Sequence, residues 1–366
     1  MVLLRKNSLD DTLVIEFSEP VKALSSTVLG GGFRELTNVV FHRVDEDFND
    51  PNPENYAREL VKEIGLPVET TAVFLTAVDV VREHVDREVK LPVKARIIAT
   101  IGFTPLVCIG DRELLYRKYS TINILLVIDK NLSNNALVDL ASLVGSIKTL
   151  ALVDLGLSCN YHGRAYSTAT DALIVASKKS GDKETYGGPV TNVGFTVSKL
   201  VYETIVEYGL KKLDLNTKFK NIFGVSIDWL VDTTVKLYTY APIPGVTVND
   251  VKKDIVHELL RLLRDPNIWA LGLAARSLDH HGLAGTIPHL EKEEYLKDSK
   301  KILVDELLGI VFSIYVNGWK GLFSYYWVDR IKHQLKMFKD KPMFIDDVLA
   351  SIIGSILSKV YDKYLE

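Results

Sequence analysis

Cysteine is scarce in this chain, with two residues, Cys108 and Cys159, among 366. So few cysteines cannot form a disulfide framework, and such usage is typical of a reducing compartment. Charge of one sign is also lacking, because 44 Lys and Arg nearly balance 47 Asp and Glu and leave a net charge of -3. A field this weak does not favour nucleic acid or an anionic membrane surface, so we expect no nucleic-acid partner.

Processing signals and long apolar runs are lacking too. The opening MVLLRKNSLDD has no apolar core and no small-residue cleavage site of the kind found in signal peptides. A membrane helix needs about 20 mostly apolar residues. The most apolar stretch, residues 303–322, contains Asp305, Glu306, Asn317 and Lys320. We therefore expect a cytoplasmic protein without a membrane span.

What remains is the composition of a globular protein of two domains. With 47% hydrophobic and 25% charged residues over 366 positions, each half can bury its own core. Up to residue 209, β-branched runs of strand length alternate with helical segments, which predicts an α/β domain with a mixed sheet. From about residue 212 the apolar period becomes 3.6, which predicts an all-α domain. We therefore expect domains at 1–212 and 213–366.

The same patterns predict the individual elements. The expected strands are 12–17, 21–29, 37–44, 72–78, 95–101, 121–128 and 172–176. In the first domain the expected helices are 55–65, 134–153 with Ser133 as N-cap, and 192–208, which Gly209 ends. In the second domain the expected helices are 230–238, 248–263, 268–278, 291–297, 303–316, 323–338 and 346–364.

Several short features of the first domain have a functional and a structural interpretation. Neither GxGxxG nor GxxxxGK[ST] occurs, so no nucleotide fingerprint is present. The run Gly30-Gly31-Gly32 lets a ligand approach backbone N–H groups, although a tight turn explains it as well. Asn123 begins an expected strand, where a buried amide is either satisfied by the core or holds a ligand.

A polar loop precedes the strand expected at 172–176. It contains three hydroxyls and a carboxylate, from Ser167, Thr168, Thr170 and Asp171. Such a group either orients a water molecule for catalysis or forms a local turn. His162 lies just upstream and is an acid or base candidate, although a lone histidine is more often structural.

These segments together resemble the adenosylcobinamide amidohydrolase family over about residues 10–209. The matching segments, in order, are SSTVLGGGF, TNVV, FLTAV, ATIG, STINILLV and STATDALIVAS, followed by Tyr186-Gly187-Gly188. The chain departs from the family at Ala169, where a glycine is expected, so the geometry of this loop differs. The resemblance implies hydrolysis of the amide that joins aminopropanol to the corrin ring of adenosylcobinamide, with release of adenosylcobyric acid. It implies no certain cofactor for this domain.

Amide hydrolysis needs an activated water or nucleophile and hydrogen-bond donors for the tetrahedral oxyanion. With the resemblance as a guide, the catalytic candidates are Asp171 as base, the amide of Asn123 as a donor, and His162 and Thr170. The candidates for holding substrate are the backbone N–H groups of Gly31 and Gly32 and the side chains of Asn38, Thr121 and Thr168.

Carboxylates interrupt the apolar helices of the second domain. Asp305 and Glu306 lie side by side in an apolar segment, where carboxylates are rarely buried without a partner or a metal ion. Asp329 lies one turn before Lys332, a spacing that a salt bridge explains.

Asp346 and Asp347 open the last expected helix, where an acid also serves as a cap. Acids on three separate helices instead favour a magnesium site, because hard cations take oxygen ligands.

The second domain resembles the archaeal-type α-ribazole phosphatase, a relative of phosphatidylglycerophosphatase A, over about residues 217–366. The matching segments are TIPHLEKEEYLKDSKKILVDELLG, YYWVDRIK and FIDDVLASIIG, with a departure at His333-Gln334, where Lys-Pro is expected. The resemblance implies removal of phosphate from α-ribazole 5'-phosphate with Mg²⁺ or a similar divalent cation. The implied ligands are Glu306, Asp329, Asp346 and Asp347, with Asp305 as a further candidate, while Lys332 contacts phosphate.

Both implied activities belong to the salvage and assembly of B12-type cofactors, so we expect a bifunctional hydrolase. The expected partners are adenosylcobinamide and α-ribazole 5'-phosphate, and assembly with a second copy of the chain stays open. Two alternatives also stay open. The first domain binds a corrinoid without catalysis, which the Ala169 departure favours, or the second domain acts on a lipid phosphate.

Overall fold

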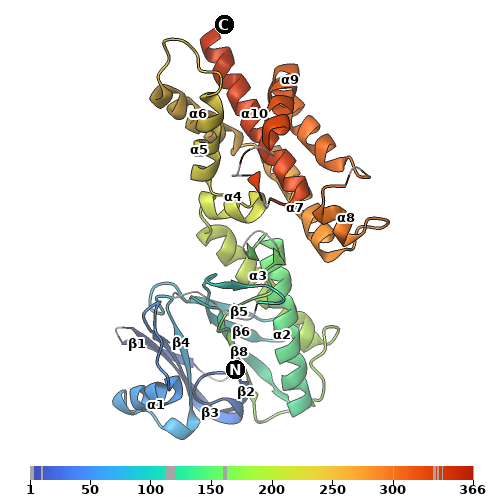
Figure 1. The fold of residues 1–366 in the computed structure, drawn as a ribbon. Helices are drawn as coiled ribbons and strands as arrows, with labels where there is room; N and C mark the ends of the chain where they lie inside the picture. Colours follow the sequence, from blue (N-terminus) through green and yellow to red (C-terminus); the bar gives the residue numbers. More distant parts are fainter. Residues whose placement is uncertain are drawn as a thin grey trace. The chain divides into compact units, whose positions relative to one another are not determined.

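The computed structural model describes residues 4–9, 11–111, 120–159, 163–299, 301–332, 335, 338–339 and 341–365. The chain forms two compact units (Figure 1). Unit 1 comprises Met1–Leu155 and Ala165–Lys212, and unit 2 comprises Gly156–Arg164 and Leu213–Glu366. The predicted fold class is confirmed, because a mixed sheet with helices is followed by a helical region.

Unit 1 is built on one mixed sheet whose strands lie in the order β4-β3-β2-β12-β8-β6-β5, with β1 beside β2 and β13 beside β8. Strands β3 and β4 are parallel, as are β12 and β8, while β2 is antiparallel to both β3 and β12. The bounds are β1 Leu4–Leu9, β2 Thr12–Ser25, β3 Gly32–Arg43, β4 Thr71–Thr76, β5 Val85–Val89, β6 Ala95–Thr100, β8 Asn123–Leu132, β12 Ala172–Lys178 and β13 Lys183–Glu184. A separate two-stranded ladder pairs β7 (Leu106–Val107) with β11 (Ser167–Thr168).

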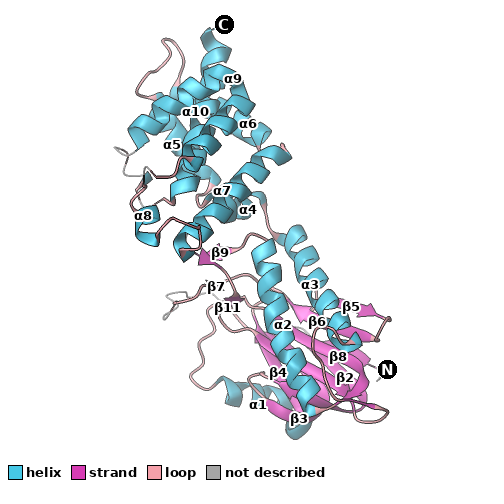
Figure 2. Cartoon of the chain, turned by 90° about the vertical axis from the view of Figure 1, so that its right-hand side faces the viewer, coloured by secondary structure: helices cyan, strands magenta, loops and turns pink. Residues whose placement is uncertain are grey.

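In the part of unit 1 that the structure describes, three helices accompany this sheet, α1 (Pro53–Glu63), α2 (Asn134–Asp154) and α3 (Asn192–Lys212), and a short 3-10 turn, η1, spans Val68–Thr70. Helices α2 and α3 run side by side along the sheet (Figure 2). Ser133 is the N-cap of α2, as predicted, because its hydroxyl accepts from the N–H of Ala136 at 3.0 Å. The prediction that Gly209 ends α3 was wrong. At this position an added Cβ would lie 2.4 Å from Leu155 Cδ1, so the glycine serves close packing inside the helix.

Alternating residues of the strands face opposite sides of the sheet. Val14 and Val40 pack against Ala57 of α1, whereas the other side contributes to a core that includes Phe74 of β4 and Leu125 of β8. Strands β3, β2 and β12 separate β4 from β8 in the sheet. Asn123 of β8 nevertheless donates to the backbone oxygen of Leu75 of β4 at 3.3 Å, so the sheet curves until these two strands approach each other.

Unit 2 is helical, apart from a short ladder between β9 (Ser158–Cys159) and β10 (Gly163–Arg164). Its helices are α4 Leu215–Phe223, α5 Ile227–Tyr238, α6 Val248–Leu262, α7 Pro266–Ala284, α8 Lys292–Leu296, α9 Val304–Lys332 and α10 Met343–Leu365. Helix α4 was not predicted, although Asp214 caps it by accepting from the N–H of Thr217 at 2.6 Å.

Helix α9 consists of two halves that reverse direction at Asn317 and Gly318, where Gly318 has a φ of 56°. The reversal follows from contacts across it, because a Cβ on Gly309 would lie 2.4 Å from the ring of Tyr325. The separate helices predicted at 303–316 and 323–338 therefore reflect a real break. Helix α10 packs against the second half so closely that a Cβ on Gly354 would lie 2.6 Å from the backbone nitrogen of Tyr325.

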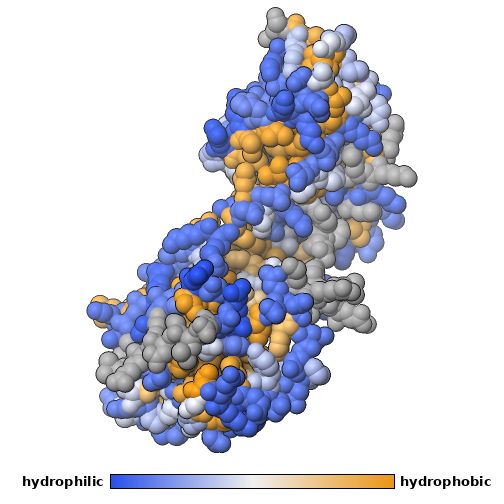
Figure 3. All heavy atoms as spheres, turned by 90° about the vertical axis from the view of Figure 1, so that its left-hand side faces the viewer, coloured by the Kyte–Doolittle hydropathy of each residue, from blue (hydrophilic) through white to orange (hydrophobic). Residues whose placement is uncertain are grey.

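Among the described residues, two helical segments are long and apolar enough to cross a membrane by length and composition, Asn134–Asp154 and Val304–Lys332, although the second reverses direction at Asn317 and Gly318. This is weak evidence, because core helices pass the same test, so the absence of a membrane span stays a prediction. Figure 3 shows a largely hydrophilic face on which both units also present apolar surface. Both cysteines are disulfide-bonded, against the expectation from their scarcity, since residue counts carry no information on which thiols meet in the fold.

Candidate functional sites

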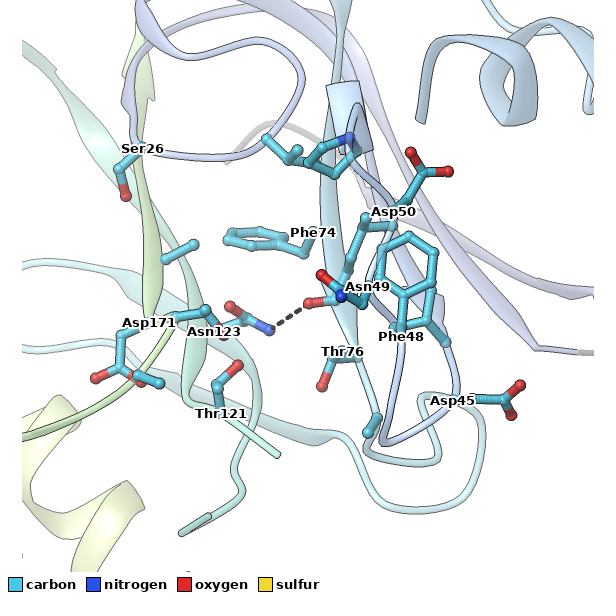
Figure 4. Close-up of a pocket in the computed structure, with 18 residues that line it drawn as sticks. Ser26, Asp45, Phe48, Asn49, Asp50, Phe74, Thr76, Thr121, Asn123 and Asp171 are labelled. Carbon is cyan, nitrogen blue, oxygen red and sulfur yellow. Dashed lines mark hydrogen bonds between the residues drawn. The ribbon is translucent and has the colours of Figure 1, made fainter. Parts of the chain in front are cut away.

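Unit 1 contains a cavity of about 570 Å³ (Figure 4). Its wall is assembled from the second half of β4, the start of β8, the loop that leads into β12 and the segment between β3 and α1. Four candidates from the sequence line it, namely Thr121, Asn123, Thr170 and Asp171. The curvature of the sheet explains their meeting with β4, which lies far from β8 in strand order.

Asn123 is 1% exposed and bridges the two sides of this wall. Its Nδ2 donates to the backbone oxygen of Leu75 at 3.3 Å and to Thr100 Oγ1 at 3.5 Å. A backbone carbonyl only accepts, so the amide nitrogen must face Leu75, and Oδ1 is the atom left for a ligand (Figure 4). This orientation favours an acceptor role for Asn123 over the oxyanion donor that the sequence predicted.

The Asp171 carboxylate is surrounded by donors. Its Oδ1 accepts from the Ile122 N–H at 3.0 Å and from the Thr168 hydroxyl. Its Oδ2 accepts from the Ser167 hydroxyl at 2.7 Å, from the Thr168 N–H at 3.1 Å and from Lys148 Nζ. A carboxylate offers about four acceptor positions. The base role of Asp171 stays a prediction, and this bonding favours an orienting role.

Lys148 was missed in the sequence. It lies on α2, donates to Ser167 Oγ at 3.0 Å and pairs with Asp171, with side chains 14% and 11% exposed. It is the single Lys or Arg within α2, which is the one signal that could have indicated a buried partner. Lys148 and Asp171 thus tie together α2, the loop before β12 and the start of β8.

The remaining candidates of the first domain lie elsewhere. Asn38 is 7% exposed and donates to Thr37 Oγ1 at 3.0 Å within the sheet. Gly31 precedes β3 and Gly32 begins it. Like Asn38 and Thr168, neither is part of the cavity wall. His162 lies outside the described residues.

In unit 2, Asp305, Glu306 and Asp347 form a cluster, since each offers a carboxylate oxygen within 4.8 Å of the others. Burial is the main cause that raises the pKa of Asp305 to about 8, and the Glu306 and Asp347 carboxylates add to it. Burial also raises the pKa of Asp347 to about 8, although Lys332 opposes the shift. Crowded carboxylates of this kind fit an oxygen-seeking divalent cation, which would compensate their charge.

Lys332 is 3% exposed and forms ion pairs with Asp329 and Asp346, the remaining carboxylates of the predicted set. Its Nζ lies 2.9 Å from Asp329 Oδ1 and 3.1 Å from Asp346 Oδ1, and it also contacts Asp347. The salt bridge between Asp329 and Lys332 that the spacing indicated is therefore present. The compact cluster contains Asp305, which was the least certain candidate, and leaves out Asp329 and Asp346.

Comparisons with known proteins add an independent finding. The family model described as adenosylcobinamide amidohydrolase matches residues 3–217. An adenosylcobinamide amidohydrolase from Methanosarcina mazei is 30% identical over 209 residues, which cover 54% of this chain and 92% of that protein. Two uncharacterized Methanocaldococcus jannaschii proteins also match. MJ1330 is 31% identical over 114 residues, which cover 31% of this chain and 87% of MJ1330. MJ1613 is 25% identical over 224 residues, which cover 55% of this chain and 86% of MJ1613.

Solved structures show only distant likeness. The low temperature requirement C protein from Listeria monocytogenes is 21% identical with a TM-score of 0.33, covering 40% of this chain and 93% of its own. The protein ypjQ from Bacillus subtilis is 18% identical with a TM-score of 0.34, and the match covers 42% of this chain and 94% of ypjQ. Scores this low support no inference. The family match extends over more than half of the sequence, and the chain therefore belongs to the adenosylcobinamide amidohydrolase family.

Proposed function

We propose that unit 1 hydrolyses the amide between aminopropanol and the corrin ring of adenosylcobinamide, and that the reaction takes place at the cavity. The observation that carries this proposal is the meeting of Asn123 and the Asp171 loop at one cavity wall, because they come from segments that carry the resemblance to the family. The products are adenosylcobyric acid and aminopropanol.

The chemistry places clear demands on the cavity. Water adds to the amide carbon, the C–N bond breaks, and the nitrogen takes up a proton as aminopropanol leaves. The Thr121 and Thr170 hydroxyls line the cavity and can orient the attacking water. Lys148 and Asp171 hold the backbone that carries both threonines, since Asp171 binds the N–H of Ile122 and lies beside Thr170.

Incubation of the intact chain with adenosylcobinamide tests this proposal, with aminopropanol and adenosylcobyric acid measured by mass spectrometry. We expect both products, and we expect Asp171→Asn to lower their formation. Asp182→Asn, an exposed change outside the cavity wall, is the matched control and should leave the rate unchanged. Corrinoid binding without release of aminopropanol would favour the non-catalytic alternative, and full activity of Asp171→Asn would exclude the base role.

We propose a second activity for unit 2, the removal of phosphate from α-ribazole 5'-phosphate. The supporting observation is the carboxylate cluster of Asp305, Glu306 and Asp347 beside the buried Lys332. These three carboxylates would hold Mg²⁺, which neutralises phosphate oxygens and activates water when it is bound. Lys332 limits the mutual repulsion of the neighbouring acids by its contacts with Asp329, Asp346 and Asp347.

Phosphate release from α-ribazole 5'-phosphate, measured with Mg²⁺ and again with EDTA, tests this second activity. We expect release that EDTA abolishes. Release from phosphatidylglycerophosphate instead would favour the lipid phosphatase alternative. Absence of release from both substrates by a protein that retains amidohydrolase activity would refute the phosphatase proposal.

A further inference from the structure

The cavity of unit 1 is small compared with the corrinoid that the proposed function requires. At about 570 Å³ it falls within the range of cavities that enclose drug-sized ligands. A corrin macrocycle with its side chains and adenosyl group is much larger than such ligands. Only one arm of the substrate fits inside, and the macrocycle must stay at the mouth.

The wall of the cavity carries negative charge. Its charged residues are Asp45, Asp50 and Asp171, and among the described wall residues there is no Lys, Arg or His. Asp171 is compensated by Lys148, whereas no cation of the described chain pairs with Asp45 or Asp50. In Figure 4 both carboxylates lie beyond Phe48 and Asn49 as seen from Asn123, and both point away from Asn123. A cleft lined by one sign of charge concentrates ligands of the opposite sign.

Asn123 gives a second and independent indication. It is 1% exposed, its Nδ2 is engaged by Leu75 and Thr100, and no described residue donates to its Oδ1. This oxygen is not among the fully buried side-chain atoms that lack a partner, so it is reached from the cavity, where water or the N–H or O–H of a ligand can donate to it. Both indications thus select a ligand rich in donors and positive in charge. Apolar contact is available from Phe48 and Phe74, which also belong to the wall.

We propose that this cavity is the binding site for the amine half of the scissile amide, a vicinal amino alcohol that becomes an ammonium ion on release. The proposal rests on the proposed amidohydrolase function and assigns the two halves of its substrate. Before cleavage the amide N–H donates to Asn123 Oδ1. After cleavage the protonated amine is attracted by the negative charges of Asp45 and Asp50 as it leaves Asn123.

The test compares two small probes on the intact chain, 1-amino-2-propanol and 1,2-propanediol, which differ by an ammonium in place of a hydroxyl. Binding is measured by ligand-observed NMR at pH 7, and each probe is also tested as an inhibitor of aminopropanol release. We expect the amine to bind about tenfold more tightly, the ratio given by one hydrogen bond to a charged group. Asp45→Asn with Asp50→Asn should bring the ratio close to one.

Asp47→Asn removes a charge of the same sign from the same segment without touching the cavity wall, so it should keep the preference for the amine. Equal binding of the two probes by a chain that hydrolyses adenosylcobinamide would overturn this assignment and leave the proposed function intact. Selective binding of the amine by a chain that releases no aminopropanol would support the amine binding site and refute the proposed amidohydrolase function.

Discussion

The pair of Lys148 and Asp171 allows a quantitative prediction about unit 1. Both side chains are largely buried, with 14% and 11% exposed, and Lys148 also donates to Ser167. Removing one partner of a buried ion pair costs about 3–5 kcal/mol when the other charge is left alone. Asp171 retains donors from Ile122, Ser167 and Thr168, which reduces the loss. We therefore expect Lys148→Met to lower the free energy of unfolding of unit 1 by about 2 kcal/mol.

A double-mutant cycle with Asp171→Asn isolates the interaction from other effects of each change. If the pair interacts as described, the double variant should be less destabilised than the sum of the single variants by about 1–2 kcal/mol. Additive effects, with a coupling energy under about 0.5 kcal/mol, would refute the inference that this pair holds the loop.

The distribution of tryptophan makes the assay specific. All four tryptophans, Trp229, Trp269, Trp319 and Trp327, belong to unit 2. Urea unfolding followed by far-UV circular dichroism reports both units, whereas tryptophan fluorescence reports unit 2. Lys148→Met should shift the circular dichroism transition of unit 1 and leave the fluorescence transition in place. A shift of the fluorescence transition would show that the change acts elsewhere.

Further predictions concern packing, pH and the carboxylate cluster. Gly354→Ala should destabilise unit 2 by about 1–3 kcal/mol in fluorescence-monitored urea unfolding, since its Cβ would lie 2.6 Å from Tyr325 N. Gly145→Ala, whose Cβ meets no atom within 4 Å, should instead stabilise unit 1 by about 1 kcal/mol, and equal effects of both changes would contradict the packing argument. Burial lowers the pKa of His42 from 6.5, against the opposing effect of Asp11. The unfolded chain therefore binds this proton more readily, and the stability of unit 1 should fall as the pH drops below about 6.5. His42→Gln should weaken that dependence, and an unchanged pH profile would count against it. Asp347→Ala should abolish phosphate release without affecting release of aminopropanol, and retained phosphatase activity would exclude Asp347 from the metal site.

Much of the fold follows from local sequence. Ser133 and the apolar run after it predict α2 within one residue of its observed end, because a cap and a periodic face are local properties. Strand β2 was expected as two strands, 12–17 and 21–29, but it is continuous from Thr12 to Ser25. Its register shifts between Glu16 and Val21, and this irregularity accommodates Pro20.

The functional sites were only partly predictable, because they depend on contacts between distant segments. Asn123 and Asp171 were found through their polar character beside apolar strands. Lys148 was not found, since its partners lie on a loop that the sequence does not place near α2. In unit 2 the acids and the Asp329–Lys332 pair were found, but the packing of helices decides that Lys332 also pairs with Asp346 and Asp347.

The segment Gly156–Arg164 belongs to unit 2, although it is enclosed in sequence by the two parts of unit 1. Ser158 donates to the backbone oxygen of Asn221 at 3.2 Å, and Arg164 donates to His280 Nδ1 at 3.2 Å. During synthesis this segment leaves the ribosome before any of the helices on which it rests, because Asn221 of α4 follows Ser158 by 63 residues and His280 of α7 follows Arg164 by 116 residues. A division of the chain at residue 212 would therefore separate the segment Gly156–Arg164 from the helices that it contacts.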